Sequence, residues 1–171
     1  MKKISWCLVL LAISFSSTGL FSSAQGEEKD QAALARALQP AKATLEAGLK
    51  TSEREGKPIS AKFEIEDGKL QLSVYTAKGD DFTEEVLDPA TGAIVKAEKI
   101  TDADDLKEAK AQSAAMTKAR RSLLTATEAV VKANAGSRAV SVEPEMKDGH
   151  PVAEVMLLQG STFKKVSSKL D

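Results

Sequence analysis

The feature that most constrains the fold is a stretch of chain that recurs without a gap 81 residues further on. In the first copy, Ile59, Ala61, Phe63 and Ile65 alternate with polar residues. This period of two is typical of a strand with one buried face. Asp67-Gly68 follows, a pair that favours a tight hairpin turn because both residues tolerate positive φ. The second copy has Asp148-Gly149 at the matching position.

Further matches extend the same register along both copies. They are Ile59 with Val140, Ser60 with Ser141, Val74 with Val155, Gly79 with Gly160, and Phe82 with Phe163. Chance explains any one of these matches, but not the series. A repeat with a fixed register indicates a duplicated structural unit.

Alternation and turn residues predict strands over residues 59–66, 70–75, 82–87 and 93–99, and then over 138–146, 151–158 and 162–166. Helical spacing predicts helices over 31–38 and from Pro40, at the first turn, to about residue 55, and a long helical region over 105–134. The sequence therefore predicts an α+β fold. It consists of two tandem units, each a helix packed on an antiparallel β-meander, joined by a long helix.

The chain divides into five segments on this prediction. They are a signal peptide at 1–24, an N-terminal helical leader at 25–39, a first module at 40–100, a helical linker at 101–117 and a second module at 118–171. The part of the long helical region before Met116 is mostly alanine and polar residues. We therefore expect it to act as a linker rather than as packed core.

The first segment has the pattern of an export signal. Lys2 and Lys3 precede a short apolar run over 4–13, and Ser22-Ser23-Ala24 supplies small residues for cleavage. Cleavage after Ala24 is the leading prediction; cleavage near Gly26 and an uncleaved membrane anchor are the alternatives. We expect a periplasmic or secreted protein that meets the membrane only through the transient signal peptide. Cleavage removes Cys7, the single cysteine, so no disulfide or thiolate metal site is expected.

The two copies differ in ways that bear on function. The turn Asp88-Pro89-Ala90-Thr91-Gly92 and the strand after it occur only in the first copy, which makes Asp88, Pro89, Thr91 and Gly92 candidate functional residues. Pro144 stands where the first copy has Phe63. Because proline cannot donate a ladder hydrogen bond, we expect an edge or a bulge at Pro144.

The second copy also has an apolar outer sheet face. Val152, Met156 and Leu158 stand where the first copy has Gln71, Tyr75 and Ala77. An apolar face needs a cover. One interpretation is that another part of the same chain covers it, which is the default for a duplicated small domain. The other is that Val152, Met156 and Leu158 form a contact face for a partner protein.

The first module resembles the PepSY domain family. The resemblance rests on a helix followed by Gly-Lys-Pro-Ile-Ser-Ala-Lys-Phe-Glu-Ile-Glu-Asp-Gly-Lys-Leu-Gln-Leu-Ser-Val and then Phe-Thr-Glu-Glu-Val-Leu-Asp-Pro-Ala-Thr-Gly, ending at Gly92. It covers about residues 40–100, and residues 118–170 resemble a second, degenerate copy. The resemblance implies a secreted or envelope α+β module with a peptidase-regulating or inhibitory role. It brings no catalytic residues.

The residues themselves favour no enzyme chemistry. His150 is the single histidine and lacks the partners of a metal site, so we interpret it as an exposed turn residue. The acids Asp102, Asp104 and Asp105 suit a helix start better than a calcium loop. The net charge of −1 gives no basic surface for nucleic acid. We expect no cofactor, no metal and no nucleic-acid partner.

Three hypotheses for the function remain. The first is an exported, non-enzymatic binding module that contacts a secreted or envelope peptidase, or another protein, through a sheet edge or the apolar sheet face. The second is a structural or homo-oligomeric envelope protein without a peptidase role. The third, an enzyme using Glu64 or Glu84, is the weakest, because these residues are expected on an exposed face where pKa tuning is hard.

Overall fold

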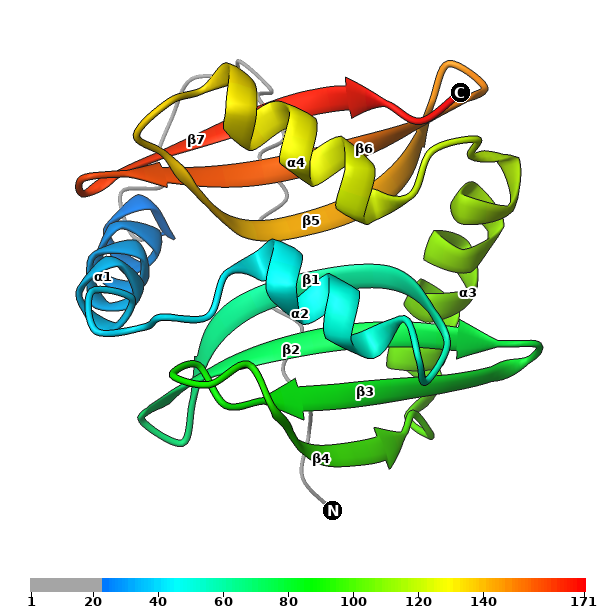
Figure 1. Cartoon of the computed structure of the whole chain (residues 1–171), viewed down its shortest axis with the longest axis horizontal. Coiled ribbons are helices and arrows are strands. Elements are labelled where there is room, and N and C mark those ends of the chain that lie inside the picture. The colour runs from blue at the N-terminus through cyan, green and yellow to red at the C-terminus, as the bar shows by residue number, and fades with distance from the viewer. Residues whose placement is uncertain (1–22) are drawn as a thin grey trace.

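The structure is a computed structural model that describes residues 23–171, with side chains from residue 28. The predicted signal peptide, residues 1–24, lies outside the described residues except for its last two positions. The described chain is α+β, with four helices and one seven-stranded antiparallel sheet (Figure 1). Within it, no helix is both long and apolar enough to cross a membrane.

The elements follow the sequence prediction closely. They are α1 Ser23–Ala37, α2 Leu45–Ser52, β1 Lys57–Glu66, β2 Lys69–Lys78, β3 Asp81–Leu87, β4 Ile94–Lys99, α3 Ala103–Lys118, α4 Leu123–Ala133, β5 Arg138–Lys147, β6 His150–Gln159 and β7 Thr162–Lys169. Both Asp-Gly hairpins have positive φ at both central residues, 50° and 74° in the first and 50° and 83° in the second. The predicted type I′ turns are therefore confirmed.

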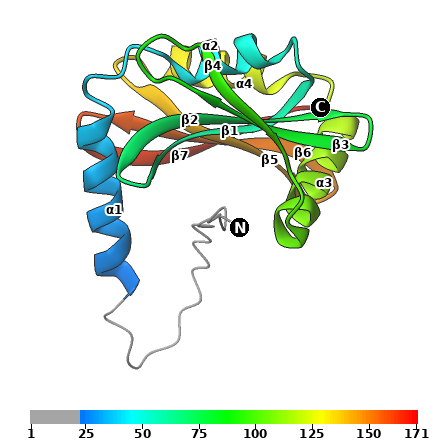
Figure 2. The same ribbon diagram turned by 90° about the horizontal axis from the view of Figure 1, so that it is seen from below.

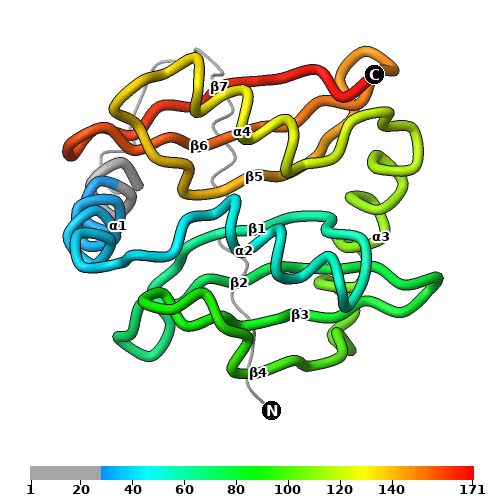
Figure 3. The backbone as a smooth tube through the Cα atoms, viewed as in Figure 1, coloured from blue at the N-terminus to red at the C-terminus, as the bar shows by residue number. Residues whose placement is uncertain are grey.

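A single sheet runs through the whole fold, in the order β4-β3-β2-β1-β5-β6-β7. The two meanders meet in the middle, where β1 pairs with β5 antiparallel through Ala61 opposite Val142 and Lys62 opposite Ser141 (Figure 3). Pro144 lies beyond this short ladder and pairs only with Ala153 of β6. Its missing N–H therefore faces a locally open edge, as expected for proline.

The helices lie in two groups. Figure 2 shows α2 and α4 together on one face of the sheet, and α1 and α3 on the other face at opposite ends. The core fills the space under α2 and α4: Leu45, Leu49, Leu123, Ala126, Ile59, Leu72, Val74, Val142, Val155 and Leu157 are all buried in one cluster. Gly48 lets α2 approach β2, since a Cβ there would lie 2.5 Å from Leu72 Cδ2.

The predicted long joining helix is wrong, because two helices occupy its place. α3 ends at Lys118, and α4 begins at Leu123 with the Ser122 hydroxyl accepting from the Thr125 N–H. The N–H groups of Arg120 and Arg121 donate to the Leu170 carbonyl at 2.7 and 3.0 Å, which takes them out of helical pairing. α3 also packs against β1, β5 and β6. It is part of the fold rather than a free linker.

The predicted helix start at Pro40 is also wrong. α2 begins at Leu45, with the Thr44 hydroxyl as its N-cap acceptor for the Ala47 N–H. The N–H groups of Lys42 and Ala43 instead donate to the Pro89 carbonyl, at 3.1 and 3.0 Å. This tertiary contact overrides the local preference of proline for a first helical turn.

Candidate functional site: the outer face and the open edges of the sheet

The predicted apolar contact face is largely covered by the chain itself. Val152 and Leu158 are only 7% and 6% exposed, while Met156 is half-buried. Because α3 packs against β6, part of this face is in contact with a helix of the same chain. Of the three predicted residues, Met156 is the one that keeps accessible surface, and a contact role for this face stays a prediction.

The predicted turn after β3 is tied to the α1–α2 connection. The Asp88 carboxylate accepts from the backbone N–H groups of Ala90 and Thr91 and from the Thr91 hydroxyl, at 2.8 to 3.0 Å. These bonds lower the pKa of Asp88. Gly92 has a φ of 72°, which closes the turn. Pro89 then offers its carbonyl to the N–H groups of Lys42 and Ala43. The turn thus has a structural role.

A basic residue at the start of β5 holds the same connection from the other side. The Arg138 guanidinium donates to the carbonyls of Leu38 and Ala43 at 2.9 and 3.0 Å and lies 5.3 Å from the centre of the Phe63 ring. Lys57, at the start of β1, donates to the Met116 carbonyl at 2.7 Å. Each meander therefore grips the segment that follows the helix at its end of the sheet.

The sheet face opposite α2 and α4 carries a polar cluster centred on β1. Lys62 Nζ lies 2.7 Å from a Glu64 carboxylate oxygen and 5.8 Å from the centre of the Tyr75 ring. Glu64 also accepts from the Ser73 hydroxyl at 2.8 Å. These contacts link β1 to β2 across the face, and the side chains of Lys62 and Glu64 are only 17% and 18% exposed.

Glu84 of β3 belongs to this cluster and is buried, at 6% exposure. The Tyr75 hydroxyl donates to it at 3.1 Å. Burial raises the pKa of Glu84 and, together with the nearby Glu84 charge, raises the pKa of Tyr75 well above its usual range. The expectation that Glu84 lies on an exposed face is therefore wrong. The pairing nevertheless keeps the phenol protonated, as a structural hydrogen-bond donor.

Helix α3 brings more acid to the same side of the sheet. Burial raises the pKa of Asp105, and burial together with the charge of Glu143 raises the pKa of Glu108 to about 7. Glu143 itself has a raised pKa, caused by burial and opposed by Lys62. Across residues 23–171, no three acidic, histidine or cysteine side chains are placed to hold a metal ion. The cluster shares charge between α3 and the sheet, and sequence reasoning missed it because α3 was expected to be a linker.

The edge strand β4 is exposed along most of its length, including Val95 at 65%. Charge pairs cover it: Lys96 with Glu98 at 2.6 Å, and Lys99 with Asp81 of β3. Such paired charges on an edge discourage strand pairing with other chains. Of the two edges, β4 is therefore the better protected.

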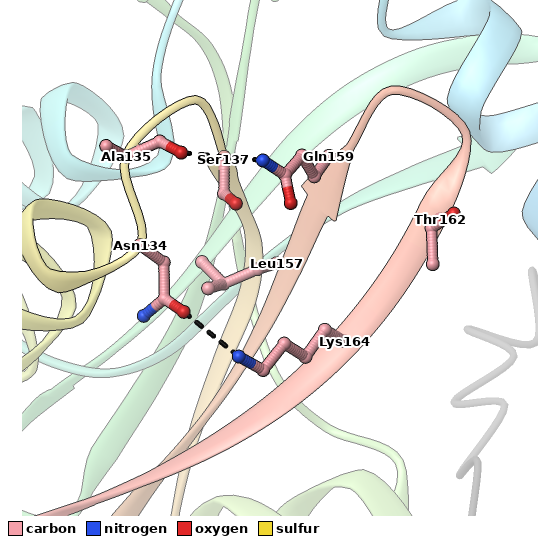
Figure 4. Close-up of a pocket in the computed structure, with 7 residues that line it drawn as sticks. All are labelled: Asn134, Ala135, Ser137, Leu157, Gln159, Thr162 and Lys164. Atoms are coloured by element: carbon pink, nitrogen blue, oxygen red, sulfur yellow. Dashed lines mark hydrogen bonds between the residues drawn. The ribbon is translucent and has the colours of Figure 1, made fainter.

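The edge strand β7 has a different character. Its charged side chains are all lysines, namely Lys164, Lys165 and Lys169, and all three are exposed. Beside it lies a small hollow of about 140 Å³, lined by Asn134, Ala135, Ser137, Leu157, Gln159, Thr162 and Lys164. Figure 4 shows Lys164 pointing across this hollow to Asn134, whose side-chain oxygen accepts from Lys164 Nζ at 3.1 Å.

The single histidine lies where the sequence indicates. His150 is exposed at the second hairpin, and its Nδ1 is paired with the Asp171 carboxylate. This contact lowers the pKa of Asp171. Its position fits the interpretation as a surface turn residue.

Comparison with known proteins adds little to this description. No protein-family model matches the chain, and no curated protein matches it. Among solved structures, one from Clostridium difficile 630, described as a "putative lipoprotein", aligns with a TM-score of 0.38 and 13% identity over 72% of this chain and 81% of that chain. We draw no conclusion about function from a similarity at this level.

Proposed function

We propose that the chain consists of two copies of one αα-meander unit and that it is an exported, non-enzymatic binding module. Support for the duplication comes from the registers. Both β1–β2 and β5–β6 have a shift at matching positions, between Pro58 and Ser60 and between Ala139 and Ser141. Ala61 and Val142, which match each other in the repeat, also pair with each other at the centre of the sheet.

The helical parts support the duplication with a second spacing. The N-caps Thr44 and Ser122 lie 78 residues apart. The Pro89 carbonyl accepts from two successive N–H groups before α2, and the Leu170 carbonyl accepts from two successive N–H groups before α4. On this basis α3 is the counterpart of α1, and α4 is the counterpart of α2.

A single observation carries the binding proposal: the sheet ends in two edge strands, β4 and β7, that no further described strand covers. An open edge presents unpaired N–H and C=O groups, and an extended peptide can add to them as a further strand. Strand addition needs no catalytic group. It is also compatible with regulation or inhibition of a secreted or envelope peptidase, the role that the PepSY resemblance implies and that we propose here.

The experiment is capture of the natural partner. A photoreactive amino acid is placed at edge position Ser167 or Ala97, or at Lys132 on the exposed side of α4 as the control, in the cell that makes the protein. We expect specific crosslinks to another protein from an edge position and none from Lys132. If only Lys132 gives crosslinks, or if no position does, the proposal fails.

A second candidate is a homo-oligomer that uses the outer face around Met156. The half-buried state of Met156, on a face with buried apolar neighbours, favours it. Sedimentation of the purified protein and of a Met156→Lys variant tests this candidate. A dimer that the substitution dissociates would support it, and a monomer at all concentrations would exclude it.

A further inference from the structure

The edge of β7 corresponds to a position that a strand fills elsewhere in the same sheet. In the first meander, β3 is covered on its outer side by β4, whereas no described strand lies outside β7. β7 matches β3 at the repeat spacing of 81, so that Phe163, Lys164 and Lys165 correspond to Phe82, Thr83 and Glu84. We propose that β7 takes up an acidic, extended segment of a partner protein in the place that β4 occupies on β3. This inference rests on the proposed binding function and names its site and its partner chemistry.

The register of the β6–β7 hairpin defines which backbone groups are available. Gln159 pairs with Thr162, and Val155 with Val166, so even-numbered residues of β7 face β6 and odd-numbered residues face outward. The counterpart strand behaves in the same way, because the Phe82 carbonyl accepts from the Ile100 N–H at 2.9 Å on its outer side. Phe163, Lys165 and Ser167 therefore offer their N–H and C=O groups to an incoming strand.

Side-chain burial points to an apolar residue in the partner. Phe82 is 4% exposed and lies opposite Ile100, which is also 4% exposed. Phe163, its counterpart, is only half-buried. A partner strand with an apolar residue opposite Phe163 would complete the packing that Ile100 provides in the first meander.

Charge points to acidic residues next to it. β4 carries lysines, Lys96 and Lys99, and covers a strand that contains Glu84 and Glu85. The charges on β7 are reversed, with Lys164, Lys165 and Lys169. In the β3–β4 register, the residues opposite Thr83 and Glu84 are Lys99 and Glu98. The corresponding partner residues would face Lys164 and Lys165, where carboxylates fit.

The hollow beside β7 lies next to the first of these positions. The side chain opposite Lys164 projects to the same side of the sheet as Lys164 itself. That side holds the hollow of about 140 Å³ with Asn134, Ser137 and Thr162 in its wall (Figure 4). A carboxylate there can accept from Lys164 and from neighbouring polar groups. The partner segment is thus read as two acids followed by an apolar residue, antiparallel to β7.

The test uses two synthetic peptides based on β4. Both carry residues 93–101 of this chain with a fluorescent label; one has Lys99→Glu, giving two acids before the isoleucine, and the control has Glu98→Lys, giving two lysines. Fluorescence anisotropy is measured with the purified protein. We expect the acidic peptide to bind at least about tenfold more tightly than the basic one, and this difference to shrink as salt is raised.

A matched pair of variants separates strand addition from simple charge attraction. Ser167→Pro removes one outward N–H while keeping the inward ladder, and Ser167→Ala keeps the N–H. We expect Ser167→Pro to weaken binding of the acidic peptide about tenfold and Ser167→Ala to leave it within about twofold. Circular dichroism checks that both variants are folded; if Ser167→Pro is not, Lys165→Glu replaces it and is expected to abolish the preference for the acidic peptide.

Three results would overturn the inference: no binding of the acidic peptide, equal binding of both peptides, or binding that is indifferent to Ser167→Pro in a folded protein. Partner capture through Ala97 but not through Ser167 would also overturn it, while leaving the general binding function in place. Capture at neither edge would instead contradict the proposed function itself.

Discussion

Ala61 and Val142 lie opposite each other at the centre of the seven-stranded sheet, although 81 residues separate them in the chain. They occupy the same position in the two copies of the repeat, so β1 and β5 meet as a near-symmetric pair. Side chains on both sides of this pair belong to one buried cluster under α2 and α4. The two meanders therefore share one core.

A shared core predicts a single cooperative unfolding transition. Leu157→Ala in β6 removes a side chain that is 1% exposed and should cost about 2–5 kcal/mol. Tyr75, the single tyrosine, lies in the other meander and reports on it by near-ultraviolet circular dichroism. We expect the Tyr75 transition to move to lower urea together with the far-ultraviolet signal. A Tyr75 transition that Leu157→Ala leaves in place would show two independent units.

The grip of Arg138 on the α1–α2 connection gives a second prediction. Its guanidinium donates to the carbonyls of Leu38 and Ala43 and contacts Phe63. Arg138→Met keeps the aliphatic packing on Phe63 but leaves these carbonyls without their donor, which should cost about 2–3 kcal/mol in urea unfolding. Lys57→Met, with one bond to the Met116 carbonyl, is the control and should cost less. Equal costs would contradict this description of the contacts.

The turn after β3 gives a third prediction, which separates structure from binding. Gly92 has a φ of 72°, so Gly92→Ala should cost about 1 kcal/mol of unfolding free energy through backbone strain. Its new Cβ would meet only the Ala43 Cβ, at an ordinary 3.7 Å. Because the turn lies far along the sheet from β7, we expect unchanged affinity for the acidic peptide. Lost affinity in a folded Gly92→Ala protein would give this turn a role in binding.

A fourth prediction concerns pH. Glu85 is fully buried under α2 and its carboxylate accepts from the Thr76 hydroxyl at 2.7 Å. Burial raises its pKa from 4.5 to about 7. A group with a raised pKa holds its proton more tightly in the folded state, so its stabilisation is complete below pH 4.5 and is lost as pH rises through about 7.

Replacing Glu85 should therefore flatten the pH profile of stability. We expect Glu85→Gln to raise the unfolding free energy at pH 8 by up to about 3 kcal/mol relative to its effect at pH 4. Glu128→Gln, at an exposed position on α4, serves as the control. An unchanged pH slope in Glu85→Gln would show that Glu85 does not titrate in this range.

Local patterns were sufficient to predict the strands and the hairpins. The alternation from Ile59 to Ile65 and the turn at Asp67-Gly68 depend on residues close in sequence, and β1 and β2 form as expected. The breaks at Pro40 and between α3 and α4 could not be predicted in this way. They depend on the carbonyls of Pro89 and Leu170, which come from distant strands.

The candidate site was predicted only in part. The repeat drew attention to Val152, Met156 and Leu158, yet burial against the rest of the chain was not visible in the pattern. The burial of Glu84 was missed for the same reason. A signal for the β7 edge was present in the sequence: Lys164 and Lys165 replace Thr83 and Glu84, and no match to β4 follows β7. Its meaning depended on the strand order, which the repeat alone does not give.

The most direct test is amide hydrogen exchange of the purified protein with and without the acidic peptide. The account predicts that the outward N–H groups of Phe163, Lys165 and Ser167 exchange quickly in the free protein and become protected when the peptide binds. The outward N–H groups of Ala97 and Lys99 on β4 should not change. Protection on β4 with none on β7, or no protection at either edge, would contradict it.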